Sequence, residues 1–541
     1  MSQVGAESSK RSAFALTLLA LLPALLSLAN GFVYDDVPVI LENPLVTQIA
    51  ESGRIWRSSY WPAGMLYRPL TIQVMALEWW IGGGRALVFH ALNVVLLVSA
   101  TLLLFRLARR MLPPAAAFAA AALFAVHPVH AEVVGNVIGQ SELLVAVLAL
   151  IAVERYVVWR AAGMLTVAQM AALALLTLMG IAAKETGYVI PGLLVLVEVA
   201  LVTDRHRHAR PALLVQGLVA AAALLVRSSV LGTLAGETPT TALAGLGPAE
   251  RAVAMLAVVP EWVRLLFWPA RLQGEYGPPA LAMTPSPGVA HLLGAMIVLA
   301  VAALLVLAWR RNRVAAFGVL WCLLGIAPVS NLLAPTGVVL AERTLFLPSV
   351  GFCLAVGAAL AAATPRLTSA GAWHLNAAKA VLALVVAAGA VRSAARYTVW
   401  RSQERFFASL QQEAPRTYRA HLVSAKYYYG AHRLADAERA ARRALTLYDR
   451  DVQVHEQLGQ ILRTERRCAE AVPILDAGVR LAPDGTTIRS RLIECALAAG
   501  DTALARASAQ EAVARGLREF EGTVARLLPR PAPAAPPAPN R

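Results

Sequence analysis

Two adjacent carboxylates, Asp35 and Asp36, follow the first long apolar stretch of the chain. A charge close to hydrocarbon is costly, so acids at a membrane surface are commonly retained because a function needs them. A carboxylate at the mouth of a membrane cavity can accept the proton of a hydroxyl group. The alternative is that the pair only caps or turns the chain where it leaves the membrane.

Further ionisable side chains are expected on the same face of the membrane. Arginine and lysine can hold a phosphate and stabilise its charge when it departs. Beside an apolar wall that accommodates a lipid chain, these groups predict sugar transfer from a lipid-linked phosphate. The expected ionisable residues are Arg68, His127, His130, Glu132, Glu142, Lys184, Glu185, Glu275, Glu342 and Arg343, in addition to the acid pair, and the polar, uncharged Gln140 is expected beside them.

Each of these features also has a simpler interpretation. His127, His130 and Glu132 have a spacing that could ligate a divalent metal, but Pro128 interrupts regular helix there. Structural hydrogen bonding is the favoured interpretation of the two histidines. Lys184 and Glu185 are neighbours that could form a local ion pair, as are Glu342 and Arg343. Adjacent residues on a helix, however, do not face each other.

The composition predicts a membrane protein that crosses the bilayer many times. Of 541 residues, 58% are hydrophobic and 15% charged, and the mean hydropathy is +0.59, which excludes an ordinary soluble enzyme. A spanning helix needs roughly 20 apolar residues. We expect about eleven spans, near 13–29, 86–105, 112–126, 143–158, 165–182, 188–202, 212–231, 289–309, 314–333, 345–362 and 377–391.

Basic residues predict the orientation of these spans, because short cytoplasmic loops are enriched in Lys and Arg. The formal charge of +16 arises largely from such loops and from the C-terminal region, so it does not indicate nucleic-acid binding. The acid pair is then expected outside, and an odd number of spans exports all that follows residue 391. The basic residues on alternate loops are Lys10, Arg11, Arg106, Arg109, Arg110, Arg155, Arg160, Arg205, Arg207, Arg210, Arg310, Arg311 and Arg313.

Composition divides the chain into a membrane domain over 1–392, a polar domain over 393–528 and a Pro/Ala-rich mobile tail over 529–541. The polar domain repeats small residues every 34 positions, which is typical of tetratricopeptide repeats because their paired helices pack closely. About three such repeats predict a short α-solenoid with a groove; an irregular helical bundle is the alternative. The repeating residues are Ala437, Ala471 and Ala505, and Ala444, Gly478 and Ala512.

The chain has four cysteines. Cys322 and Cys353 lie in expected spans and are interpreted as packing residues. Cys468 and Cys495 lie in the expected exported domain, where a disulfide is chemically permitted. Their spacing does not show whether they pair.

An ordered set of motifs covers most of residues 30–360. They are Phe32-Val33-Tyr34-Asp35-Asp36 with Asn43, Tyr67-Arg68-Pro69-Leu70-Thr71, Phe89-His90-Ala91-Leu92-Asn93, His127-Pro128-Val129-His130-Ala131-Glu132, Ala183-Lys184-Glu185, Pro328-Val329-Ser330-Asn331-Leu332, and the run from Ala341-Glu342-Arg343 to Gly351-Phe352.

With these motifs the chain resembles the transmembrane and tetratricopeptide-repeat (TMTC-type) O-mannosyltransferases. The resemblance implies an all-α polytopic bundle of the GT-C type and a polyprenyl-phosphate-linked sugar as donor. It implies that Asp35 or Asp36 is the catalytic acid of the first outer loop and that Glu132 is the acid of the second. Arg343, Lys184 and Arg68 are assigned to donor phosphate. His127, His130, Glu185, Glu342 and Glu275 are assigned to supporting roles.

The short repeat array and the high Ala, Arg and Gly content resemble a bacterial relative, with an undecaprenyl-type carrier. The expected reaction is inverting transfer of a hexose, mannose in the family, to Ser or Thr of an exported protein bound by the repeats. The membrane domain would lie in the bacterial inner membrane with its site on the periplasmic side. Two alternatives are a glycan or lipid acceptor with the same donor, and a non-catalytic scaffold that recruits partners. A metal requirement is left open.

Overall fold

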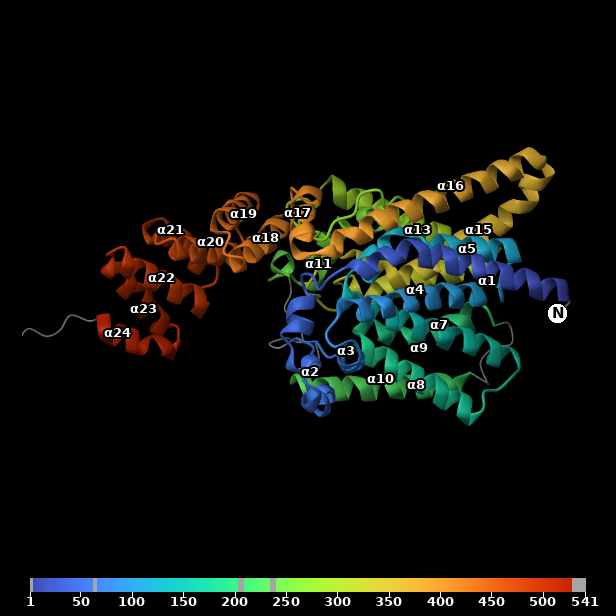
Figure 1. Ribbon diagram of the computed structural model, residues 1–541, viewed down its shortest axis with the longest axis horizontal. Coiled ribbons are helices and arrows are strands. Elements are labelled where there is room, and N and C mark those ends of the chain that lie inside the picture. Colours follow the sequence, from blue (N-terminus) through green and yellow to red (C-terminus); the bar gives the residue numbers. More distant parts are fainter. Residues whose placement is uncertain (1–2, 62–65, 203–208, 234–239, 528–541) are drawn as a thin grey trace, which may run out of the picture. The chain divides into compact units, whose positions relative to one another are not determined.

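The computed structural model describes residues 3–61, 66–202, 209–233 and 240–527 (Figure 1). The expected tail over 529–541 lies outside the described residues. The described part of the chain is built from helices without a β-strand, which confirms the all-α prediction. The chain divides into two compact units, Met1–Tyr276 with Leu281–Glu413, and Gly277–Ala280 with Ala414–Arg541.

The first unit combines long apolar helices with short connecting ones. Its α-helices are α1 (Gln3–Ala24), α2 (Pro44–Thr47), α3 (Pro69–Gly82), α4 (Ala86–Ala108), α5 (Pro114–Ala125), α6 (Ala131–Gly135), α7 (Gln140–Ala161), α8 (Val167–Ala183), α9 (Val189–Ala200), α10 (Arg210–Leu231), α11 (Pro248–Leu256), α12 (Val259–Phe267), α13 (Val289–Arg311), α14 (Arg313–Ile326), α15 (Phe346–Ser369), α16 (Ala372–Tyr397) and α17 (Gln403–Glu413).

Within the described residues, seven helices are long and apolar enough to cross a membrane. Helix α5 and the segment Pro128–Gly135, bent by 43°, make an eighth if they are one span. All eleven expected stretches lie on helices, which confirms a multi-pass architecture. The remaining three, α8, α9 and α14, have 17, 12 and 14 residues. They are shorter than the roughly 20 residues that cross hydrocarbon.

Helix α7 forms the centre of the membrane unit. Most of its residues are buried, and it packs against α4, α8, α9 and α15. Helices α13 and α16 instead expose nearly all of their apolar side chains, as membrane-facing helices do. The core of the unit is therefore an apolar helix surrounded by others, with lipid contact left to the outer helices.

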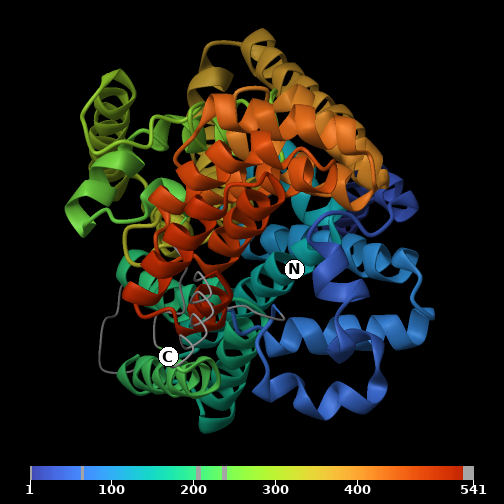
Figure 2. The same cartoon turned by 90° about the vertical axis from the view of Figure 1, so that its left-hand side faces the viewer.

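The two ends of this helical bundle carry different residues. At the end of α4, Arg106 and Arg110 lie 3.4 and 3.6 Å from Glu154 of α7. Arg155 also pairs with Glu154, at 2.6 Å, so one carboxylate joins basic residues of two expected inner loops. At the beginning of α4, His90 lies 3.4 Å from the carbonyl oxygen of Gly31, just before the acid pair. Short helices between α1 and α4, drawn in blue, gather at this second end (Figure 2).

The second unit consists of helices in antiparallel pairs. The first helices of three pairs begin at Tyr418, Val452 and Thr486, and their partners begin at Leu434, Cys468 and Thr502, in each case 34 residues apart. The repeat expected from small residues is thus the repeat of the helices themselves. The helices are α18 (Tyr418–Gly430), α19 (Leu434–Leu447), α20 (Val452–Thr464), α21 (Cys468–Leu481), α22 (Thr486–Ala498), α23 (Thr502–Ala514) and α24 (Glu521–Leu527).

Small residues explain these pairings. Ala437, Ala471 and Ala505 are completely buried, and a side chain on Gly478 would meet Ile488 and His455. A larger residue at any of these positions would push the paired helices apart. The small residues that repeat every 34 positions therefore lie where the helices pack against each other.

Helices α14 and α15 also pack at close range through two glycines. A Cβ atom on Gly318 would meet backbone atoms of Gly351 and Ala355, and one on Gly351 would meet the backbone nitrogen of Cys322. Small residues at such crossings let helix backbones approach, which is a principal source of helix association in membranes. Because Arg343 lies in the short helix Glu342–Leu345, which leads directly into α15, this contact helps to place that residue.

We expect Gly351→Ala to lower the free energy of unfolding by about 1–3 kcal/mol, because backbone atoms must shift to admit the methyl group. Gly217→Ala on α10 is the matched control, since nothing lies within 4 Å of that position. Thermal unfolding of the purified protein in detergent measures both. Equal midpoints for the two variants would contradict the close packing.

Candidate functional site

The acid loop, residues 30–36, is fixed at both sides by hydrogen bonds to distant segments. The side-chain amide of Asn30 donates to the carbonyl oxygens of Gly135 and Tyr397, each at 3.0 Å. The backbone nitrogen of Gly31 donates to the carbonyl oxygen of Arg401 at 3.2 Å. The loop is therefore held between α6 and the segment that follows α16.

Asp36 faces the interior of this loop. It is completely buried, and its two carboxylate oxygens accept from the backbone nitrogens of Val33 at 2.9 Å and Ile138 at 3.0 Å. Burial raises the pKa of Asp36 to about 7, although these hydrogen bonds act in the opposite direction. The carboxylate thus closes its own turn and ties it to the segment before α7.

Asp35 is placed differently. Its side chain is partly exposed, and it follows Tyr34, whose φ of 59° lies in the left-handed region that side chains rarely adopt. The Tyr34 backbone nitrogen donates to Gln403 Oε1 at 3.0 Å, and its hydroxyl donates to Glu275 Oε1 at 2.7 Å. Its ring stacks on Phe406 at 5.4 Å. These contacts hold the unusual backbone conformation that presents Asp35.

Glu132 and Arg343 form an ion pair between two segments that are 211 residues apart. The guanidinium of Arg343 donates to Glu132 Oε1, and its backbone nitrogen donates to Oε2 at 2.9 Å. Glu132 is buried, whereas the Arg343 side chain remains 21% exposed. The carboxylate therefore positions the arginine, and part of the guanidinium stays accessible.

Two further cations are held in the same way. Lys184 Nζ lies 2.5 Å from Glu142 Oε1, and Arg68 Nη2 lies 2.9 Å from Glu185 Oε2. Burial lowers the pKa of Lys184, and the charge of Glu142 opposes that effect. The local ion pair considered for Lys184 and Glu185 does not form, because each side chain is paired with a residue from another segment.

The three cations and the acid loop form one electrostatic cluster. The charge of Arg343 interacts with Asp35 and Glu275, and the charge of Lys184 interacts with Arg68 and Arg343. Tyr60 connects Arg68 with Asp35. The guanidinium of Arg68 lies 4.8 Å from the centre of the Tyr60 ring, and the charge of Asp35 acts on the Tyr60 hydroxyl. The structure thus brings Asp35, Arg68, Lys184 and Arg343 to one region.

Glu342 points away from its neighbour Arg343. It is buried and accepts from the backbone nitrogen of Gln273 at 2.5 Å and from the hydroxyl of Tyr276 at 2.7 Å. The local pair considered for Glu342 and Arg343 is therefore not formed. Glu342 thus fixes residues 273–276 against the segment that carries Arg343, and Glu275 of the same stretch accepts from the hydroxyl of Tyr34.

The two histidines make hydrogen bonds to other protein groups. His127 Nε2 lies 2.9 Å from the carbonyl oxygen of Leu266, and His130 Nε2 lies 2.8 Å from the hydroxyl of Ser349. Glu132, the third member of the expected metal set, is engaged by Arg343. Among the described residues, no group of three or more His, Cys, Asp or Glu is placed to hold a metal ion.

Sequence reasoning did not assign site roles to Glu142, Tyr34 or Tyr60. Glu142 was recognised as an outer ionisable residue, and its pairing with Lys184 is the reason to include it. Tyr34 stands beside the acid pair in the sequence, but its left-handed conformation and its contacts are not visible there. Tyr60 belongs to none of the sequence motifs, and no local signal indicates its contact with Arg68.

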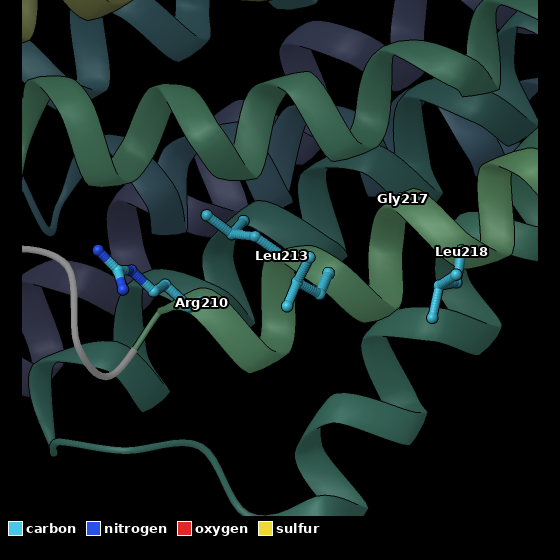
Figure 3. Close-up of a pocket in the computed structure, with 5 residues that line it drawn as sticks. Arg210, Leu213, Gly217 and Leu218 are labelled. Atoms are coloured by element: carbon cyan, nitrogen blue, oxygen red, sulfur yellow. The ribbon is translucent and has the colours of Figure 1, made fainter.

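A hollow of about 470 Å³ lies elsewhere, on the apolar surface of α10 (Figure 3). It is lined by Arg210, Leu213, Leu214, Gly217 and Leu218, so it offers one basic group at the beginning of the helix and otherwise apolar contacts. None of the clustered charged residues takes part in it. We therefore place the candidate site at the acid loop.

The fold and the charged cluster define a multi-pass helical membrane protein with a helical repeat unit. No family model matches the chain. It is 26% identical over 371 residues to Protein O-mannosyl-transferase F38B6.6 of Caenorhabditis elegans, covering 65% of this chain and 51% of that protein. It is 26% identical over 490 residues to Protein O-mannosyl-transferase TMTC1 of Homo sapiens, covering 81% and 55%.

A shorter match, to Protein O-mannosyl-transferase Tmtc1 of Drosophila melanogaster, is 37% identical over 169 residues and covers 29% of this chain and 20% of that protein. The chain thus spans about half the length of the first two curated relatives. These relatives confirm the resemblance drawn from the motifs. Over most of its length the chain is therefore similar to the transmembrane and tetratricopeptide-repeat (TMTC-type) O-mannosyl-transferases.

We expect the stability of the protein to fall between pH 4 and pH 8 in a manner that depends on Asp36. Its folded pKa of about 7 is above the ordinary value of 3.8, so the folded state binds a proton more tightly than the unfolded state. The resulting stabilisation is complete below pH 3.8 and is lost as pH rises through 7. Thermal midpoints of wild type and Asp36→Asn should therefore converge or cross as pH rises. A constant difference would contradict the raised pKa.

Proposed function

We propose that this protein is a membrane glycosyltransferase that moves a hexose, mannose by its relatives, from a polyprenyl phosphate to Ser or Thr of an exported protein. The observation that carries the proposal is the cluster of Asp35 with Arg68, Lys184 and Arg343 at one end of the helical bundle. The names of the relatives support sugar transfer to protein. The lipid donor follows from the chemistry of this cluster beside a membrane.

In this reaction Asp35 is the general base. It is partly exposed, whereas Asp36 is buried and holds the backbone of the loop. Asp35 accepts the proton of the acceptor hydroxyl while the hydroxyl oxygen forms a bond to C1 of the sugar. The bond from C1 to the phosphate oxygen breaks at the same time, and polyprenyl phosphate leaves. Attack from the face opposite the phosphate inverts the configuration at C1.

The three cations stabilise the departing phosphate. Each is fixed by one carboxylate, namely Arg343 by Glu132, Lys184 by Glu142 and Arg68 by Glu185. A positively charged group that is already oriented needs little rearrangement when charge develops on the leaving group. Arg343 is the most exposed of the three, so we assign it the direct contact with phosphate.

We propose that the acid loop lies on the periplasmic side of a bacterial cytoplasmic membrane. The basic residues Arg106 and Arg110 support a cytoplasmic assignment for the opposite end of the bundle. The acid loop is hydrogen-bonded to Arg401, which follows α16, so the chain leaves the membrane unit at the same end. The repeats that come after Glu413, which we interpret as tetratricopeptide repeats, are then available to exported acceptors.

The test is release of polyprenyl phosphate by the purified protein in liposomes, from radiolabelled polyprenyl-phosphate mannose with and without exported protein acceptors. We expect Asp35→Asn to lower acceptor-dependent release by about 100-fold or more, the range of a general base. Glu42→Gln is the matched control, because Glu42 is an exposed acid that follows the acid loop closely in the chain. Full activity of Asp35→Asn would overturn the assignment of the base.

The same assay separates the alternatives. Release with saccharide or lipid acceptors, and none with protein, would move the reaction to a different acceptor. If none of a panel of lipid-linked sugars is transferred and the full-length protein captures a partner, the non-catalytic scaffold is favoured instead. Inverted stereochemistry of the product checks the single-displacement mechanism.

Helix α17 positions the base within this proposal. Gln403 and Phe406, on the helix that leads to the repeats, contact Tyr34, which precedes Asp35. Trp400 stacks on Phe406 at 4.5 Å, and a Cβ atom on Gly135 would meet Trp400, so the same contacts reach the segment that carries Glu132. Helix α17, the last helix of the first unit, therefore supports the conformation of the acid loop.

We expect Gln403→Ala to lower kcat about fivefold while leaving the KM for donor unchanged. One hydrogen bond contributes about 1 kcal/mol, and here it holds the loop rather than the substrate. Gln412→Ala on the exposed face of the same helix is the control. A change confined to KM, or an equal effect of the control, would contradict the positioning role.

A further inference from the structure

Cys468 and Cys495 lie side by side in the repeat unit. Cys468 begins α21, Cys495 lies in the last turn of α22, and their Sγ atoms are 2.7 Å apart. Both are buried in one apolar cluster with residues such as Leu458, Leu475 and Leu492. The two helices are adjacent in the repeat and pack directly on each other.

We propose that Cys468 and Cys495 form a disulfide that joins the second helix pair to the third. This inference rests on the exported location of the repeats in the proposed function. A disulfide has an S–S distance of about 2.05 Å, so a small rotation of the two side chains brings the sulfurs into bonding range. The compartment outside the cytoplasm maintains such bonds.

The reaction is thiol–disulfide exchange with a disulfide-containing oxidant of that compartment, such as a disulfide oxidoreductase. The thiolate of one cysteine attacks the oxidant and forms a mixed disulfide. The second thiolate then displaces the oxidant's remaining sulfur. The two cysteines lose two protons and two electrons, and the oxidant becomes a dithiol.

Burial determines when this exchange takes place. It raises the pKa of the Cys495 thiol to about 12, so the reactive thiolate is scarce once the helices have packed. The bond therefore forms while the repeats are folding, and the apolar cluster then protects it from reductants. The two cysteines are 27 positions apart in the chain. A bond between them closes that segment into a loop and restricts the conformations of the unfolded repeat unit.

Peptide mass spectrometry tests the bond in the full-length protein. Cells are lysed in the presence of a thiol-alkylating reagent, and the protein is digested with trypsin without reductant. Cleavage after Arg467, Arg480, Arg491 and Arg506 places the two cysteines on separate peptides. We expect those peptides to be covalently linked and to separate on reduction. Cys322 and Cys353, on α14 and α15, should carry the alkyl group and serve as internal controls.

Alkylated Cys468 and Cys495 in the native protein would overturn the proposal. Refolding the unfolded, reduced protein with oxidised glutathione then shows whether the expected compartment or the expected packing of the two helices is wrong. Bond formation only under that treatment means that the pair is competent but the repeats face a reducing compartment. Absence of the bond even then means that the packing of α21 on α22 is wrong.

Stability measurements provide a second readout. Cys468→Ser, Cys495→Ser and the double variant should lower the thermal midpoint of the repeat unit to the same extent, by about 5 °C or more. Reductant present during unfolding should lower the thermal midpoint of the wild type by the same amount and leave the midpoints of the variants unchanged. Additive effects of the two single variants would overturn the bond.

Polyprenyl phosphate release on the same preparation separates this inference from the proposed function. A linked pair without transfer of any tested sugar leaves the disulfide and the exported location standing and removes the catalytic proposal. Sugar transfer by a protein in which both cysteines are alkylated would overturn the disulfide and leave the proposed glycosyltransferase activity standing.

Discussion

The structure depends on a single electrostatic constraint, which is that a charge enclosed beside hydrocarbon must have an opposite charge close to it. Arg343, Lys184 and Arg68 satisfy this constraint with carboxylates from other segments of the chain. Each ion pair therefore also joins two segments. The loops that emerge from separate helices are drawn to one place, and the cations acquire fixed orientations there.

The two neighbouring acids meet the same constraint in different ways. Asp36 is enclosed, and two backbone nitrogens satisfy its oxygens, so it acts on the shape of the loop. Asp35 keeps contact with the surroundings and lies in the field of Arg343. Two identical, adjacent residues thus differ in burial, next to the left-handed backbone at Tyr34: Asp36 holds the turn, and Asp35 remains accessible.

Much of the fold could be predicted because its causes are local. A run of apolar residues long enough to cross a membrane forms a helix wherever it stands, since backbone groups in lipid must be satisfied internally. Every stretch expected to span lies on a helix, but α8, α9 and α14 are shorter than the runs suggested. Hydropathy averages over apolar loops and helix ends alike, so it does not locate the residue at which a helix stops.

The candidate site was predictable in its members but not in their pairing. Charged residues in outer loops could be recognised one at a time, and the motifs set them in family order. Their partners could not be recognised, because Glu132 and Arg343 are 211 residues apart and Lys184 is bound to Glu142 rather than to the adjacent Glu185. Neighbours in sequence proved to be poor guides to neighbours in space.

The sequence by itself determined the helical class, the multi-pass membrane architecture and the 34-residue repeat, because hydropathy and small-residue spacing are properties of continuous stretches of the chain. Only the tertiary structure decided which carboxylate holds each cation, which aspartate remains accessible and which cysteines meet. Those outcomes depend on contacts between segments that are far apart in the chain. Such contacts are set by how whole helices pack, and no local pattern contains that information.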